Sequence, residues 1–114
     1  FLKNIDPKYF FTNFNLTGSS NYAFNLILLE KNIKLFKNIC YNLDKNGIEY
    51  RVGSAGGGNQ LRQPYIKRMF KKDYYKKFKN TEHVHFFCMY IGNYPDLSQK
   101  DIRYICKIIN NSVA

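Results

Sequence analysis

The stretch that decides the fold is "NYAFNLIL" (21–28), which is followed by "KNIKLFKNICYNLDKNG" (31–47) and "IEYRV" (48–52). The first and third segments have the β-rich composition of strands. The middle segment changes to a helical spacing of apolar residues. In the first strand one face is formed by Tyr22, Phe24, Leu26 and Leu28. The helical stripe consists of Ile33, Phe36, Cys40 and Leu43, flanked by Leu35 and Ile39. The sequence therefore predicts a strand, a helix and a second strand in succession.

The ends of the helices are marked by capping residues. Asn32 is a candidate N-cap for the first helix, and Gly47 stands where a helix end favours a left-handed residue. Ser98 and Asp101 have the spacing of a capping box. They predict a last helix whose inward side chains are Ile102, Ile105, Cys106 and Ile109.

"VHFFCMYIG" (84–92) predicts a third strand around Met89 to Ile91. A right-handed crossover makes the first two strands parallel, and the third strand can lie between them, antiparallel to both. Two apolar helices need one sheet to cover. The expected fold is a two-layer α+β domain with a small, mostly antiparallel three-stranded sheet and helices on one face.

The chain has 114 residues, which is enough for one domain with its own core. Residues 1–20 are polar and aromatic with several breakers, and we interpret them as a linker leading into a domain at 21–114. The sequence starts with Phe1 and not with Met, which suggests a portion of a longer protein.

The composition is strongly basic, with 18 Lys and Arg against 8 Asp and Glu. This charge indicates either an anionic partner or a solvated, lysine-rich surface. The three cysteines form no CxxC pair, which favours a reducing, cytoplasmic compartment. No apolar run is long enough to span a membrane, so no membrane partner is expected.

The glycine-rich stretch "RVGSAGGGNQLRQP" (51–64) has neither the P-loop nor the dinucleotide-binding spacing. It is either a surface turn or a loop whose backbone approaches a ligand closely. Arg51, Asn59 and Arg62 flank the glycines and offer donors for an anion.

The run "KRMFKKDYYKKFK" (67–79) combines cations with aromatic residues. This pattern suits a nucleic-acid-binding module, and it equally suits a solvated face. His83 and His85 would point the same way on a strand, but no third metal ligand accompanies them, so no metal is expected. No catalytic set can be assembled from this chain.

Three stretches resemble a known family, and the first of them, "SSNYAFNLIL" (19–28), is similar to the strand that begins the small C-terminal domain of that family. "KNGIEYRVGSAGGGNQLRQPYIK" (45–67) is similar to the pattern GIE-x-R-P…GN-x-x-R-Q-P of sugar-modifying enzymes of the DegT/DnrJ/StrS family. "HVHFFCMYIGNYPDLSQKDIRYICKIIN" (83–110) resembles the closing strand, the YIGN-x-P-x-L turn and the last helix of that family. The resemblance covers residues 19–112. This sequence departs from the family pattern at Val52, where the family usually has Pro, and its glycine run is longer.

The resemblance implies the small C-terminal domain of a fold-type I enzyme that uses pyridoxal phosphate (PLP), acting as a homodimer. Such enzymes are aminotransferases or 3-dehydratases of nucleotide-linked 4-keto-6-deoxyhexoses in surface-polysaccharide (lipopolysaccharide, O-antigen) biosynthesis. The cofactor would bind to a large domain that is missing here, so this chain alone would not be catalytic. The residues implied to contact the nucleotide-sugar are Arg51, Asn59, Arg62 and, as a further candidate, His85. The alternative from the residues themselves is a small basic RNA- or DNA-binding module.

Overall fold

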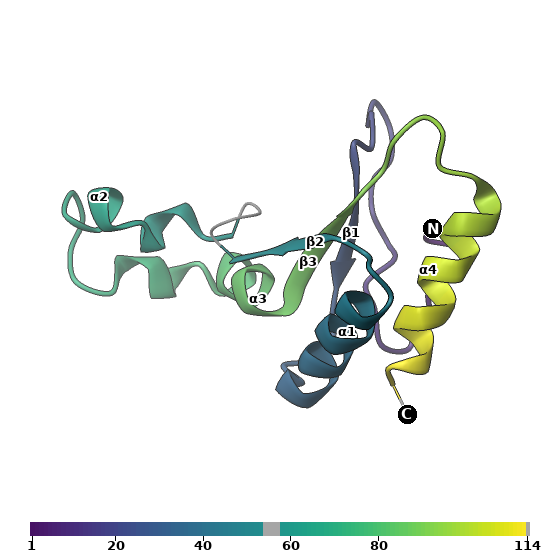
Figure 1. Cartoon of the computed structure of the whole chain (residues 1–114). Helices are drawn as coiled ribbons and strands as arrows, with labels where there is room; N and C mark the ends of the chain where they lie inside the picture. The colour runs from purple at the N-terminus through teal and green to yellow at the C-terminus, as the bar shows by residue number, and fades with distance from the viewer. Residues whose placement is uncertain (54–57, 114) are drawn as a thin grey trace.

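In the computed structural model, which describes residues 1–53 and 58–113, a small sheet carries two long helices (Figure 1). The strands are β1 (Ala23–Ile27), β2 (Tyr50–Val52) and β3 (Cys88–Gly92). The α-helices are α1 (Ile33–Lys45), α2 (Pro64–Lys67), α3 (Lys79–Phe87) and α4 (Gln99–Asn111). Two 3₁₀ turns, η2 (Gln60–Arg62) and η3 (Tyr74–Lys77), lie between β2 and α3.

The sheet has the order β1-β3-β2, with β3 antiparallel to both neighbours. Leu26 pairs with Met89 on one side, and Val52 pairs with Met89 on the other. Since β1 and β2 both run antiparallel to β3, they are parallel to each other. The α+β fold class and the insertion of the third strand are therefore confirmed.

The helix ends follow the predicted capping chemistry. Asn32 Oδ1 accepts the amide of Leu35 at 2.9 Å at the start of α1. Gly47 has a φ of 66°, and its amide donates to the Asp44 carbonyl at 3.0 Å. Ser98 and Asp101 form the reciprocal capping box of α4.

The core lies between the sheet and the two helices α1 and α4. Its buried residues include Leu26, Leu35, Ile39, Leu43, Met89, Ile91, Ile105, Cys106 and Ile109. The inward face of α4 is as predicted. The buried stripe of α1 differs from the predicted one. Ile39, expected at its flank, is fully buried, and Ile33, expected within it, is 55% exposed. The apolar positions on α1 form two adjacent stripes, and packing against α4 and the sheet selects the one centred on Ile39.

Within residues 1–20, interpreted from the sequence as a linker, the first ten pack against the domain and residues 15–20 are exposed. Ile5 and Phe10 are buried in the core. The ring of Phe1 stacks on that of Phe24 with centroids 4.8 Å apart. Phe10 also forms an isolated antiparallel bridge with Leu28.

Residues 58–87 form an arm that projects to one side of the sheet and the two long helices (Figure 1). The radius of gyration of 15.1 Å exceeds the value of about 13 Å expected for a compact chain of this length. The expected connector at 71–80 contains η3 and the first residues of α3. The strand geometry suggested for His83 and His85 is wrong, because both lie on α3. On a helix, residues two apart point in different directions.

The position of Ile39 in the core can be tested against Ile33 on the same helix. We expect Ile39→Ala to lower the free energy of unfolding by about 2–5 kcal/mol, because it removes buried methyl groups and leaves a cavity. Ile33→Ala should change it by less than about 0.5 kcal/mol, because its side chain is largely solvated. Urea unfolding followed by circular dichroism measures both, and equal losses would contradict the assigned packing.

Candidate functional site

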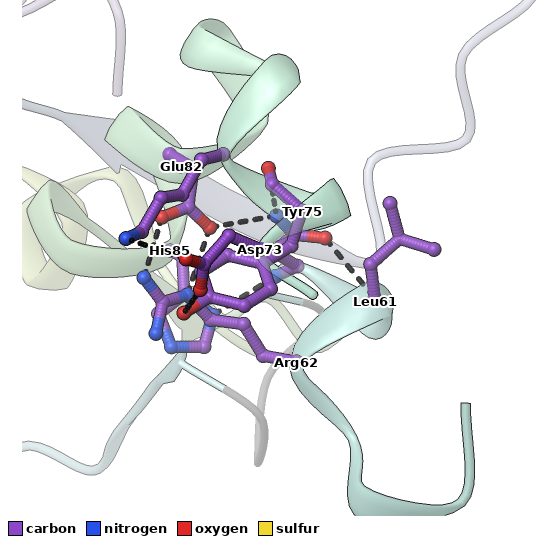
Figure 2. A network of polar contacts seen from close by, with 8 residues as sticks. Leu61, Arg62, Asp73, Tyr75, Glu82 and His85 are labelled. Carbon is purple, nitrogen blue, oxygen red and sulfur yellow. Dashed lines mark hydrogen bonds and ion pairs between the residues drawn. The ribbon is translucent and has the colours of Figure 1, made fainter. Parts of the chain in front are cut away.

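Three of the four residues singled out from the sequence meet in one polar network at the base of the arm (Figure 2). We call Asn59, Arg62, Tyr75, Glu82 and His85 the anchor network. These side chains come from the segment after the glycine loop, from η3 and from α3. The network therefore fastens three parts of the arm to one another.

Asn59 is the most buried member, at 2% exposure. Its side-chain amide donates to Glu82 Oε1 at 2.7 Å and to the Tyr75 carbonyl at 3.3 Å. Its Oδ1 accepts the amide of Leu61 at 3.1 Å, which caps the turn η2. A buried amide needs its partners within the protein, and here every side-chain donor and acceptor role of Asn59 is occupied.

Arg62 makes a two-pronged ion pair with Glu82. Its Nε lies 2.8 Å from Oε1 and its second terminal nitrogen 2.5 Å from Oε2. The guanidinium is also 4.3 Å from the centroid of the Tyr75 ring and 4.6 Å from that of Phe86. The pair lowers the pKa of the Glu82 carboxyl, chiefly through the hydrogen bonds from Arg62. The charge of Arg62 is thus compensated inside the arm.

His85 lies beneath the base of the glycine loop. Its Nδ1 accepts the amide of Asn59 at 2.9 Å, so in the neutral ring the proton is on Nε2. Gly58 donates to the Gly53 carbonyl at 2.8 Å and closes the base of the loop above this ring. A Cβ on Gly58 would lie 2.4 Å from His85 Nδ1. The remaining predicted loop glycines, Gly56 and Gly57, lie outside the described residues.

Arg51 is not brought into this network. It lies on β2 opposite Tyr90, on the face of the sheet away from Met89 and the helices. Its side chain is 53% exposed and forms an ion pair with Glu49, with Nη2 and Oε1 2.9 Å apart. An exposed pair of this kind is weak, so Arg51 can exchange Glu49 for another anion.

The described residues do not assemble a metal-binding set. No group of three His, Cys, Asp or Glu residues among them could hold a metal ion. Burial raises the pKa of the Cys88 and Cys106 thiols to about 11, which leaves them protonated at neutral pH. No helix in the described ranges has the length and hydropathy required to cross a bilayer.

Glu82 and Tyr75 are the members of the network that sequence reasoning missed. A signal was present for Glu82, because the acidic residues between Glu49 and Asp96 are only Asp73 and Glu82. In this part of the sequence, Arg62 therefore has only two candidate acidic partners. Tyr75 contributes its backbone carbonyl and its ring face, and neither role has a sequence pattern.

Comparison with known proteins gave no match. No protein family, curated protein or solved structure among those compared is similar to this chain.

The contact between Gly58 and His85 predicts a strong effect of an added methyl group. Gly58→Ala should destabilise the fold by about 1–3 kcal/mol, because the Cβ would also lie 2.7 Å from the carbonyl carbon of Gly53. Gly92→Ala is the matched control, because a Cβ there meets no atom within 4 Å. Thermal unfolding compares the two variants, and an unchanged Gly58→Ala protein would disprove the close approach.

The hydrogen bond to His85 predicts a pH dependence of stability. Burial, followed by the nearby charge of Arg62, lowers the pKa of His85 below its usual 6.5. The unfolded chain then binds a proton more readily than the folded one. The stabilisation is complete above pH 6.5 and is lost as the pH falls through the lowered pKa.

His85→Asn places an amide oxygen near the Nδ1 position and cannot titrate there. We expect its stability to vary less between pH 7.5 and 5.5 than that of the wild type, as measured by urea unfolding. The corresponding window for Glu82 lies below pH 4.5 and is separate. An identical pH dependence in both proteins would contradict this role of His85.

Proposed function

We propose that this chain is the C-terminal small domain of a PLP-dependent nucleotide-sugar aminotransferase or 3-dehydratase. The substrate class would be a nucleotide-linked 4-keto-6-deoxyhexose used for surface polysaccharide. The proposal is supported chiefly by the Gly-Asn…Arg-Gln-Pro element, whose residues form one interlocked unit. Asn59 and Arg62 share the Glu82 carboxylate, and Pro64 begins α2.

The closing-turn element also has a structural role in the domain. The amide of Asn93 donates to the Tyr22 carbonyl at 3.1 Å, and its side chain donates to the Asn21 carbonyl at 2.8 Å. These bonds tie the residues after β3 to the start of β1. The two motifs that carry the family resemblance therefore lie at opposite ends of the sheet strands and fix the chain at both.

The structure suggests different roles for the substrate-binding candidates. Glu82 engages the Asn59 side-chain amide and one edge of the Arg62 guanidinium, so we propose that both residues position the segment that follows the glycines. Arg51, exposed beside that loop, keeps a guanidinium that can bind a phosphate or a sugar oxygen. His85 remains a candidate through Nε2, because Nδ1 is already committed to Asn59.

PLP itself does not fit the residues of this domain. The cofactor requires an enclosed lysine for a Schiff base, or the histidine of some dehydratases, and a phosphate site around it. Every lysine of this chain is exposed to solvent. In the proposal, the cofactor and its electron-sink chemistry belong to the large domain, and this domain contributes contacts to the sugar.

The proposal includes a cytoplasmic homodimer with its active sites at the subunit interface. The cysteines Cys40, Cys88 and Cys106 are all unpaired, which is consistent with a reducing compartment. The sheet face that carries Arg51 and Tyr90 is the surface we assign to the substrate side of the interface with the large domain.

Nucleic-acid binding by the lysine run is less well supported. Single-stranded nucleic acids need aromatic faces that are free for stacking. Here Phe70 and Tyr74 stack on each other at 4.9 Å, and Arg62 and Lys67 both lie over the ring of Tyr75. These three aromatic residues of the lysine run thus already have partners.

The test uses the protein expressed with the coding sequence upstream of Phe1. We expect a visible absorbance band from bound PLP and binding of a nucleotide-sugar by calorimetry. Arg51→Ala should weaken that binding by about tenfold, because it removes a charged donor. Arg103→Ala, an exposed arginine on α4, is the control and should bind as the wild type does. Absence of both the absorbance and nucleotide-sugar binding would exclude the proposed function.

A further inference from the structure

A hollow of about 270 Å³ lies on the arm, and it shares Tyr75 with the anchor network. It is lined by Leu61, Lys67, Phe70, Lys71, Lys72, Asp73, Tyr74 and Tyr75. Three of the eight lining residues are lysines, and all three are exposed. We call this feature the arm hollow.

The charge around the arm hollow is strongly positive. Between Lys67 and Lys79 the chain has seven cationic residues and one acid, Asp73. Asp73 is itself compensated, because its carboxylate lies 3.3 Å from Lys76 Nζ and accepts the Tyr75 hydroxyl at 3.2 Å. With three lysines and one carboxylate in its lining, the hollow keeps a net positive charge.

The walls of the arm hollow are held in place by the rest of the arm. Tyr75 is fixed through its carbonyl by Asn59 and through its ring by Arg62. The stacked rings of Phe70 and Tyr74 form an apolar part of the lining. Asp73 has a φ of 62°, which turns the chain between the lysines before it and the aromatic residues after it. A site held in this way loses little freedom when a ligand binds.

We propose that the arm hollow binds a diphosphate group, either free or as part of a nucleoside diphosphate. Lysine ammonium groups bind phosphate as point charges, and three around one hollow match the charge of a diphosphate. The volume is below the usual 300–1,000 Å³ range of drug-sized pockets, which suits a small anion. The ring faces are occupied, so recognition rests on the phosphates and not on a stacked base.

This inference stands on the arm alone and is independent of the proposed function. Under the proposed function, the diphosphate would be that of the nucleotide-sugar. A chain without a PLP-binding domain could still bind a diphosphate here. A negative result for the proposed function would therefore leave this inference standing, and the reverse also holds.

The experiment titrates the 114-residue chain with pyrophosphate, with a nucleoside diphosphate such as CDP, and with orthophosphate. Calorimetry at low and moderate salt measures the affinity. We expect saturable binding of pyrophosphate at one site, with weaker binding of orthophosphate. The double variant Lys71→Ala/Lys72→Ala should bind pyrophosphate at least about tenfold more weakly. A CDP affinity equal to that of pyrophosphate would support a site for the phosphates alone, and a tighter one would support a nucleoside diphosphate.

Two further variants make the test specific. Lys34→Ala/Lys37→Ala removes the same charge from the exposed surface of α1 and should leave the affinity unchanged. Asp73→Asn removes the only acid of the hollow and keeps a residue that tolerates a positive φ. It should strengthen pyrophosphate binding several-fold.

Equal losses in the two lysine double variants would overturn the proposal, because the effect would then be one of net charge. It would also be overturned if the chain bound oligonucleotides or anionic vesicles but showed no saturable binding of pyrophosphate. Circular dichroism of each variant verifies that the exposed substitutions leave the fold intact.

Discussion

The arm depends on one carboxylate, that of Glu82. It accepts two bonds from Arg62 and one from Asn59, and so it joins the segment after the glycine loop to α3. The Glu82 side chain is 17% exposed and that of Arg62 24%, so water can screen this pair only in part. A charge in such a position needs a charged partner, and removal of either one leaves the other without compensation. The two residues therefore stabilise the arm only as a pair.

This constraint changes how the glycine-rich segment is understood. The polar residues that follow the glycines suggest direct ligand contacts, but their donors are used to hold the loop base and the turn η2. Glycine is required at position 58 for a complementary reason, because the backbone there passes too close to His85 and Gly53 for any side chain. In the structure Asn59 and Arg62 join the segment after the glycines to α3 through Glu82. Arg51 is the exception, because it lies outside the network and remains exposed.

Much of the fold could be predicted from the sequence because it is determined locally. Asn32, Gly47 and the Ser98–Asp101 pair mark the helix ends through hydrogen bonds to neighbouring backbone, and such contacts are visible in the sequence. The parallel direction of β1 and β2 is expected for two strands joined by one crossover helix, and a split β-α-β sheet allows a third strand between them.

The arm could not be predicted in this way. Residues 79–87 have no clear helical period, and the strand-like run of apolar residues that begins within them continues into β3. Whether His83 and His85 share a face depends on where the helix ends and the strand begins. His85 lies on the helical side of that boundary, where its Nδ1 accepts the amide of Asn59, a residue distant in the sequence. The choice of Ile39 over Ile33 is likewise made by packing across the domain.

α3 ends at Phe87 and β3 begins at Cys88, without an intervening residue. The carbonyl of Phe87 also accepts the amide of Leu28, directly after β1. On this side the arm continues directly into the central strand. A displacement of α3 would therefore act on the middle of the sheet, where β3 is hydrogen-bonded to β1 on one side and to β2 on the other. We therefore expect the rate of amide hydrogen exchange in β3 to change when a ligand binds at the far end of the arm.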